Sequence, residues 1–288
     1  ASPMKRSSLL IGLFAGVLSL APALAQDLRK ISIGITPTLV ADLSLEKLKF
    51  IGEEFPLLVK EFTGLVGTLE RPATTMELAA KVADGKDQFG VFQGIEFAEA
   101  QTKHPELQPI LLTIYRTPEV KAILVAKNEG GAESFAALKG QEVAVLKEGK
   151  EHIRRYAQKE AGGDAAKFFS KVVNPATAEA ALDAVLQGKV QAAVVDSASF
   201  DQYKEVNPGR FRKLKIIGSS PVFPPSVIAC NPNKVDAGTV KTFQDGMLKA
   251  DQTAKGRDVM GTFKISSFQP VPADFEKSLT AIRQAYAE

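Results

Sequence analysis

The chain has 288 residues and a formal net charge of +3, with one cysteine and no tryptophan. That length allows one large or two medium domains, each able to bury its own core. A nearly neutral chain without a basic run gives no indication of nucleic-acid binding, and the single Cys230 excludes an intrachain disulfide framework. We expect this thiol to be a small buried hydrophobe.

The N-terminal segment has the three parts of a secretory signal peptide in order. Lys5-Arg6 supplies positive charge, an apolar run covers 9–20, and Ala23-Leu24-Ala25 offers the small residues that a signal peptidase accepts. The run is shorter than the roughly 18 apolar residues of a membrane-spanning helix. We therefore expect a signal peptide over 4–25 and a mature chain from about Gln26. Because no cysteine stands at the cleavage point, the exported protein should be periplasmic and not lipid-anchored.

Downstream, short apolar runs alternate with helical patterns. Alternating or continuous apolar residues predict strands over 31–35, 65–69, 89–92, 110–115, 121–126, 143–146, 192–195, 214–217 and 227–229. Apolar spacings of three and four predict helices over 48–62, 76–83, 94–103, 149–161 and 178–187, with three more up to the C-terminus. This alternation predicts an α/β fold of mostly parallel sheets covered by helices.

Pro56 interrupts the first helical pattern. Either the helix kinks at this proline, or the main helix begins there with Pro56 in its first turn.

Two segments with turn chemistry divide the chain. They are Arg116-Thr117-Pro118 and the proline-rich stretch 219–225. We interpret them as the two strands of a hinge. Residues 26–117 and 222–288 would then form lobe I, and 118–221 would form lobe II.

Five pieces of sequence, in this order, resemble one family. They read Ile-Gly-Ile-Thr-Pro-Thr from Ile33, Pro-Leu-Leu-Val-Lys-Glu-Phe-Thr-Gly from Pro56, Tyr-Arg-Thr-Pro-Glu-Val-Lys-Ala-Ile-Leu-Val-Ala from Tyr115, Ser-Phe-Ala-Ala-Leu-Lys-Gly-Gln-Glu-Val-Ala-Val from Ser134, and Val-Leu-Gln-Gly-Lys-Val-Gln-Ala-Ala-Val-Val-Asp from Val185. The chain is similar to type 2 periplasmic solute-binding proteins of ABC transporters, and closest to the phosphate/phosphite/phosphonate-binding group. It departs from the phosphonate-binding pattern at Lys147-Glu148-Gly149-Lys150, where relatives have a Ser/Thr-rich loop.

The resemblance implies two lobes, joined by two crossover strands, that close on a small polar, anionic, phosphate- or phosphonate-like ligand and deliver it to an ABC permease. The alternative is the same fold used as a sensing receptor that presents its ligand state to a membrane signalling protein. We expect a monomer without a cofactor or metal. An enzyme is not expected, because the sequence has no nucleophile–base constellation, and His104 and His152 have no partners at metal-ligand spacing. Both histidines should lie on exposed helix faces.

Ligands of open α/β sheets bind at the carboxyl ends of strands and the N-termini of the following helices. Polar or small residues at such places, and in the two hinge segments, are the ligand-binding candidates. They are Thr36, Thr38, Gln93, Gly94, Tyr115, Thr117, Lys147, Gly149, Lys150, Asp196, Ser197 and Ser219.

Each candidate has a purely structural alternative. Thr36 and Thr38 could belong to an ordinary turn, and Gly94 could either admit ligand oxygens to helix N–H groups or form a tight turn. Tyr115 could stack on a solute or be a packed hinge aromatic, with Thr117 beside it, and Ser219 could be a polar hinge residue.

The charged candidates are also ambiguous. The segment from Lys147 to Lys150 could bind an anion through backbone amides and two ammonium groups, or it could be a solvated turn. Asp196 could accept a hydrogen bond from a ligand, and it could equally cap the helix that begins at Ser197.

Overall fold

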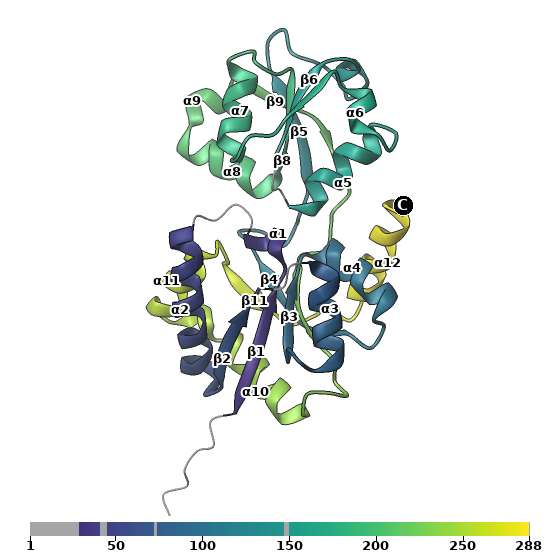
Figure 1. Ribbon diagram of the computed structural model, residues 1–288. Helices are drawn as coiled ribbons and strands as arrows, with labels where there is room; N and C mark the ends of the chain where they lie inside the picture. Colours follow the sequence, from purple (N-terminus) through teal and green to yellow (C-terminus); the bar gives the residue numbers. More distant parts are fainter. Residues whose placement is uncertain (1–28, 41–44, 72–73, 147–149, 288) are drawn as a thin grey trace, which may run out of the picture.

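The structure, a computed structural model, describes residues 29–40, 45–71, 74–146 and 150–287 (Figure 1). The expected signal peptide lies outside these described residues. Within them, no helix combines the length and the hydrophobicity that crossing a membrane requires.

The first of two sheets has six strands in the order β11-β4-β10-β3-β1-β2. The strands are β1 (Lys30–Ile35), β2 (Val66–Glu70), β3 (Phe89–Phe92), β4 (Gln108–Ile114), β10 (Ser226–Cys230) and β11 (Ser267–Gln269). β1 runs parallel to β2 and β3, whereas β10 is antiparallel to β3 and β4, and β11 is antiparallel to β4.

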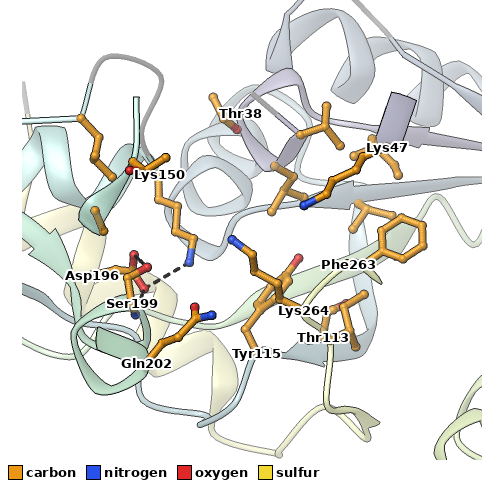
Figure 2. Close-up of a pocket in the computed structure, with 18 of the residues that line it drawn as sticks. Thr38, Lys47, Thr113, Tyr115, Lys150, Asp196, Ser199, Gln202, Phe263 and Lys264 are labelled. Atoms are coloured by element: carbon orange, nitrogen blue, oxygen red, sulfur yellow. Dashed lines mark hydrogen bonds and ion pairs between the residues drawn. The ribbon is translucent and has the colours of Figure 1, made fainter. Parts of the chain in front are cut away.

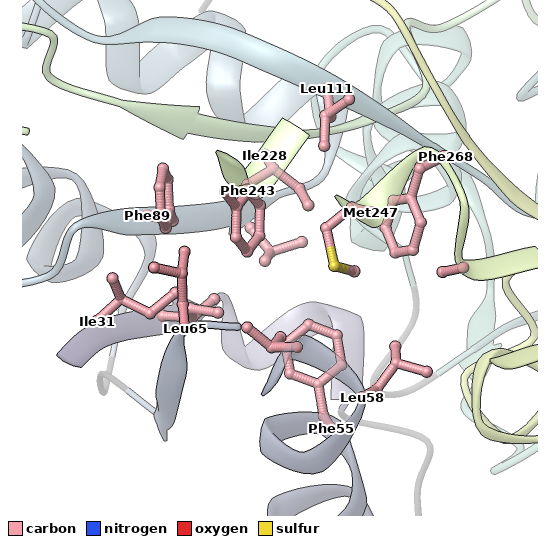
Figure 3. Packing of buried hydrophobic residues seen from close by; sticks show 14 of the residues in the cluster. Ile31, Phe55, Leu58, Leu65, Phe89, Leu111, Ile228, Phe243, Met247 and Phe268 are labelled. Atoms are coloured by element: carbon pink, nitrogen blue, oxygen red, sulfur yellow. The ribbon is translucent and has the colours of Figure 1, made fainter. Parts of the chain in front are cut away.

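Helices cover both faces of this sheet, and together they form the first lobe. They are α1 (Pro37–Val40), α2 (Leu45–Thr63), α3 (Thr75–Asp84), α4 (Gly94–Lys103), α10 (Ala237–Met247), the 3₁₀ turn η2 (Ala250–Gln252), α11 (Ala254–Thr262) and α12 (Phe275–Ala285). Side chains of α2, α10 and α11 pack on one face around Phe89 and Phe243. Figure 3 shows those of α2 and α10. Side chains of α3, α4 and α12 pack on the other face.

The second sheet has five strands in the order β7-β6-β8-β5-β9. The strands are β5 (Ala122–Lys127), β6 (Glu142–Val145), β7 (Lys171–Val173), β8 (Ala192–Asp196) and β9 (Leu214–Ser219). The second lobe consists of this sheet with η1 (Ala136–Leu138), α5 (Glu151–Glu160), α6 (Ala165–Phe168), α7 (Ala178–Leu186), α8 (Ser197–Val206) and α9 (Pro208–Phe211). Figure 1 shows the two lobes joined by two connecting segments, from β4 to β5 and from β9 to β10.

The expected α/β fold is confirmed, and both sheets are mixed. β5 lies between β8 and β9 and is antiparallel to both, and β10 stands in the same relation to β3 and β4. These are the two strands that the chain enters directly from the other lobe. When a helix connects two strands of one sheet, the second strand runs parallel to the first. A strand that the chain enters from the other lobe has no such connection and can run in the opposite direction. Each sheet therefore receives one inverted strand in its interior.

Helix α2 runs without a break through Pro56. A main helix that begins at Pro56 is therefore ruled out. Proline lacks the N–H that would bond to the carbonyl of Gly52, so one helical hydrogen bond is missing. Phe55 before the proline and Leu58 after it are buried in the same hydrophobic cluster, which keeps both halves of the helix on one core.

Cys230 is buried at the end of β10, as expected, and burial raises the pKa of its thiol to about 11.

Truncation of Phe243 should strongly destabilise the first lobe. Its ring is fully buried and stacks on that of Phe89, with 4.2 Å between centroids. Phe243→Ala should lower the free energy of unfolding by about 3–5 kcal/mol because it removes buried area and leaves a cavity. Urea unfolding followed by circular dichroism measures this. Leu57→Ala on α2, where the side chain is 49% exposed, is the control and should change it by less than about 0.5 kcal/mol. Equal effects of the two substitutions would contradict the packing.

Candidate functional site

A cavity of about 400 Å³ lies between the two lobes. The first lobe contributes residues of α1, α2, β4 and the segment after α11, and the second contributes the start of α5 and residues of α7 and α8. Figure 2 shows side chains from both lobes facing this space, which we call the interlobe cavity. Of the predicted residues, Thr38, Tyr115, Lys150 and Asp196 line it.

An ion pair between Lys150 and Asp196 marks the side of the cavity that belongs to the second lobe. Asp196 ends the buried strand β8 and caps α8, where its carboxylate accepts hydrogen bonds from the backbone N–H of Ser199 at 2.9 Å and from the Ser199 hydroxyl at 2.6 Å. The Nζ of Lys150, at the N-cap of α5, lies 3.3 Å from Asp196 Oδ1. Helix capping and ion pairing thus occur together at Asp196.

The ionised form of Asp196 is favoured. Its side chain is only 4% exposed, so burial by itself would raise the pKa of the carboxyl. The charge of Lys150 and the hydrogen bonds from Ser199 outweigh burial and hold that pKa well below its usual range. Asp196 is therefore a carboxylate at neutral pH, with its charge balanced by Lys150.

Three ammonium groups converge on the cavity from three separate elements. Figure 2 shows the side chains of Lys47 on α2, Lys150 at the start of α5 and Lys264 after α11 turned toward the middle of the cavity. Lys150 also lies 5.7 Å from the centre of the Tyr115 ring. The lining carboxylates among the described residues are Asp196 and Glu179, and Glu179 is exposed and accepts a hydrogen bond from Asn207. Among the described lining residues, three lysines thus face two carboxylates.

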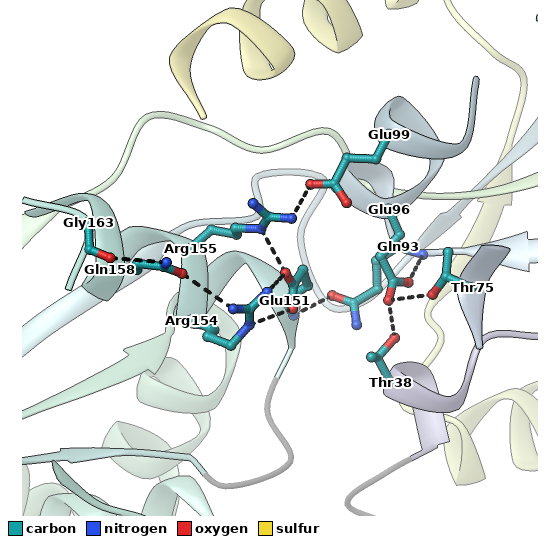
Figure 4. Close-up of polar contacts among 10 residues, drawn as sticks. All are labelled: Thr38, Thr75, Gln93, Glu96, Glu99, Glu151, Arg154, Arg155, Gln158 and Gly163. Atoms are coloured by element: carbon teal, nitrogen blue, oxygen red, sulfur yellow. Dashed lines mark hydrogen bonds and ion pairs between the residues drawn. The ribbon is translucent and has the colours of Figure 1, made fainter. Parts of the chain in front are cut away.

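Thr38 lies in the cavity wall, but its hydroxyl proton is already used. Its Oγ1 donates to Oε1 of Glu96 at 2.7 Å (Figure 4), and the hydroxyl of Thr75 donates to the same oxygen at 3.0 Å. Glu96 is buried, and burial raises the pKa of its carboxyl despite these hydrogen bonds. Thr38 can therefore offer a ligand an acceptor but not a donor. Thr36 is fully buried behind it and does not line the cavity.

Gln93 joins the two lobes. Its Oε1 accepts a hydrogen bond at 3.0 Å from the backbone N–H of Glu151, in the first turn of α5 (Figure 4). Close by, Glu99 of α4 pairs with Arg155 of α5 at 2.6 Å. The N-terminal half of α4 is thus a contact surface for the second lobe, and the amide oxygen of Gln93 is already occupied.

Gly94 is required by close packing. A Cβ built on it would lie 2.1 Å from the carbonyl oxygen of Pro224. The second connecting segment therefore covers the start of α4 at the point where the sequence suggested an opening for ligand oxygens.

A smaller cavity of about 40 Å³ lies beside the connecting segments and is lined by Gln93, Gly94, Thr117 and Ser197 among others.

His152 also lines this smaller cavity and is only 2% exposed, so the prediction of an exposed face is wrong for this histidine. Helix α5 packs His152 against Phe223 of the second connecting segment, with 5.5 Å between ring centroids, and local periodicity does not reveal such a contact. Burial, followed by the charge of Lys150, lowers the pKa of His152 to about 3, so the ring is neutral at pH 7.

The remaining candidates lie elsewhere. Ser219 is exposed at the end of β9, donates to the carbonyl of Ser220 and lines neither cavity. The hydroxyls of Thr117 and Ser197 both donate to the carbonyl of Glu119. Lys147 and Gly149 fall outside the described residues.

Several residues in the cavity or directly behind it escaped sequence reasoning. Lys47 and Lys264 sit in segments with ordinary surface charge patterns, Gln202 is one polar residue among many on α8, and nothing in the sequence distinguishes buried Glu96 from the other glutamates of the helices. Ser199 was recognisable from its position after Asp196. No group of three or more His, Cys, Asp or Glu side chains in the described ranges could hold a metal ion.

Neutralising Asp196 should change the pH dependence of stability. An acid whose pKa is depressed by folding stabilises the fold above its ordinary pKa, here 3.8, and this stabilisation is lost as pH falls through the folded pKa. At pH 7, Asp196→Asn should lower the free energy of unfolding by about 2 kcal/mol through loss of charged hydrogen bonds. The difference from wild type should shrink as pH drops below 3.8.

Urea unfolding at a series of pH values from 7 to 3 measures this difference. Asp201→Asn replaces an exposed carboxylate on the same helix and is the control. A difference between wild type and Asp196→Asn that stayed constant down to pH 3 would show that the ion pair contributes nothing.

Comparison with known proteins places the chain in a family. Residues 58–275 match the family model described as ABC transporter, phosphonate, periplasmic substrate-binding protein. No curated protein sequence matches.

Solved structures share the fold at low identity. A binding protein component of an ABC phosphonate transporter from Pseudomonas aeruginosa is 19% identical, with a TM-score of 0.62 over 90% of this chain and 87% of that one. XAC2383 from Xanthomonas citri, bound to ATP, is 12% identical, with a TM-score of 0.65 over 90% and 99%. PhnD1 from Prochlorococcus marinus, in complex with methylphosphonate, is 14% identical, with a TM-score of 0.64 over 89% and 98%. The family match covers about three quarters of the chain, and the fold agrees with it: this protein belongs to the phosphonate family of ABC-transporter periplasmic substrate-binding proteins.

Proposed function

We propose that this protein captures a small polar anion, phosphate- or phosphonate-like, between its two lobes and delivers it to the permease of an ABC transporter. The observation that carries the proposal is the convergence of Lys47, Lys150 and Lys264 on the interlobe cavity. An anion bound among these groups gains charge-assisted hydrogen bonds, which are stronger than neutral ones.

Closure of the lobes would be the signal that the permease reads. We infer that lobe I comprises residues 26–117 and 222–288 and lobe II residues 118–221, with the hinge in the two connecting segments. The segments pair through a bridge between Val120 and Phe223, and the contact between α4 and α5 lies beside them. A ligand that touches both lobes binds the closed state more tightly than the open one and shifts the population toward it.

The remaining parts of the proposal come from the sequence. A signal peptide over 4–25 would export the chain to the periplasm, where it would act as a monomer and without catalysis.

A ligand screen by thermal shift tests the proposal. The panel is phosphate, phosphite, methylphosphonate, methanesulfonate and, as cationic and neutral comparisons, arginine and glucose. A ligand at a hundredfold excess over its dissociation constant stabilises the folded state by about 2.7 kcal/mol, which raises the melting temperature measurably. We expect only anions to do so. Stabilisation by arginine or glucose alone would contradict the proposal.

Lys150 should contribute directly to anion affinity. Lys150→Ala should weaken the best anion at least tenfold, because a hydrogen bond to a charged group is worth about 1.5–3 kcal/mol. Isothermal titration calorimetry measures the dissociation constant. Lys241→Ala, on the exposed surface of α10, is the matched control and should bind as wild type does.

The single variant also leaves Asp196 unpaired, so a double variant separates the two effects. If Lys150 touches the anion, Lys150→Ala with Asp196→Asn should still bind weakly. Wild-type affinity in the double variant would show that Lys150 serves only to neutralise Asp196.

A further inference from the structure

The two walls of the interlobe cavity differ in chemistry. On the side of the first lobe, the buried residues Phe55, Val91, Ile228 and Phe268 of the hydrophobic core reach the lining. Thus the core of the first lobe extends to the cavity surface.

Partly exposed apolar side chains complete this wall. Leu39 and Val40 of α1, and Phe263 and Ile265 after α11, are partly buried, pack against the same core and line the cavity. The ring of Phe263 packs edge-on against Phe55, with 5.4 Å between centroids. We call Leu39, Val40, Phe55, Phe263, Ile265 and Phe268 the apolar wall. Part of it is visible beside Lys47 in Figure 2.

The facing wall, from the second lobe, is mostly polar near α5 and α8, with Val206 of α8 as an apolar member. Lys150, Asp196, Ser199, Gln202 and Asn207 line it. The first lobe also contributes Lys47 and Lys264, so a ligand in the cavity meets polar groups from both lobes and a continuous stretch of hydrocarbon from the first lobe.

A small oxyanion contacts only the polar part of this lining and leaves the apolar wall uncovered. Closing the cavity around such an ion would place some of its oxygens against the apolar wall. This costs free energy, because the hydrogen bonds that those oxygens make to water are lost and not replaced. The space is also large: the cavity has a volume of about 400 Å³, whereas methylphosphonate has only five non-hydrogen atoms. A ligand with an apolar body would instead gain from covering the wall.

We propose that the cargo is an amphiphilic organic anion, with its charged headgroup among the lysines and an alkyl or aromatic body along the apolar wall. This inference rests on the proposed function, since it assumes that the interlobe cavity holds an anionic ligand. It adds the requirement for an apolar body of several carbon atoms.

A homologous series of ligands tests the inference. Methyl-, butyl-, hexyl-, octyl- and phenylphosphonate share one headgroup, and hexanol and hexyltrimethylammonium share an alkyl body without the anion. Calorimetric titration should show the dissociation constant falling about three- to fourfold per added methylene until the wall is covered, since each buried CH₂ contributes a fixed increment. Hexanol and the cation should bind at least a hundredfold more weakly than hexylphosphonate.

Variants locate the body of the ligand. Leu39→Ala and Phe263→Ala should each weaken octylphosphonate about tenfold and leave methylphosphonate within twofold of wild type. Ile216→Ala removes an apolar side chain that is 52% exposed on β9, outside the cavity, and is the control for both ligands. Leu39 lies on a short surface helix. If Phe263→Ala does not fold, Leu39→Ala still tests whether the body of the ligand lies along the apolar wall.

The outcomes separate this inference from the proposed function. Affinity that is independent of chain length, with methylphosphonate bound as tightly as the octyl compound, would overturn the amphiphile and leave the anion receptor intact. Tight binding of hexanol or the alkyl cation would overturn the anion receptor while supporting the apolar wall. If none of the compounds bound, both proposals would fail.

Discussion

The ion pair between Lys150 and Asp196 is the interaction on which the site depends. A buried carboxylate at the end of β8 is costly, and it would repel an anionic ligand if it stood alone. Ser199 and the first turn of α8 satisfy its hydrogen bonds, and the ammonium group of Lys150 balances its charge. The pair also connects the starts of α5 and α8, so the polar wall of the cavity is held together by the same contacts that make it electrically neutral.

The connection between the lobes follows from the two inverted strands. β5 and β10 each enter the middle of a sheet from the other lobe, which places both connecting segments side by side at the edge of the cavity. There they contact the starts of α4 and α5: Pro224 lies against Gly94, and Phe223 against His152. The tight packing at this point gives the predicted residues Gln93 and Gly94 contacts within the protein.

The asymmetry of the cavity reflects how each lobe is closed. In the second lobe, the starts of α5 and α8 face the cavity and present polar groups. In the first lobe, the short helix α1 and the segment after α11 leave core side chains partly exposed. Exposed apolar surface costs about 25 cal/mol per Å² in water, so this wall is stabilised when something apolar covers it.

The sequence by itself determined the α/β elements, the candidate residues at strand ends and the family. Apolar periodicity reports which side of a segment is buried, and Asp196 and Lys150 stand at boundaries that local chemistry defines. Only the tertiary structure decided that the sheets are mixed, that His152 and Glu96 are buried, and that Lys47 and Lys264 line the same cavity as Lys150. These facts depend on contacts between segments that are far apart in the chain, and a local pattern shows that a face is covered but does not show what covers it.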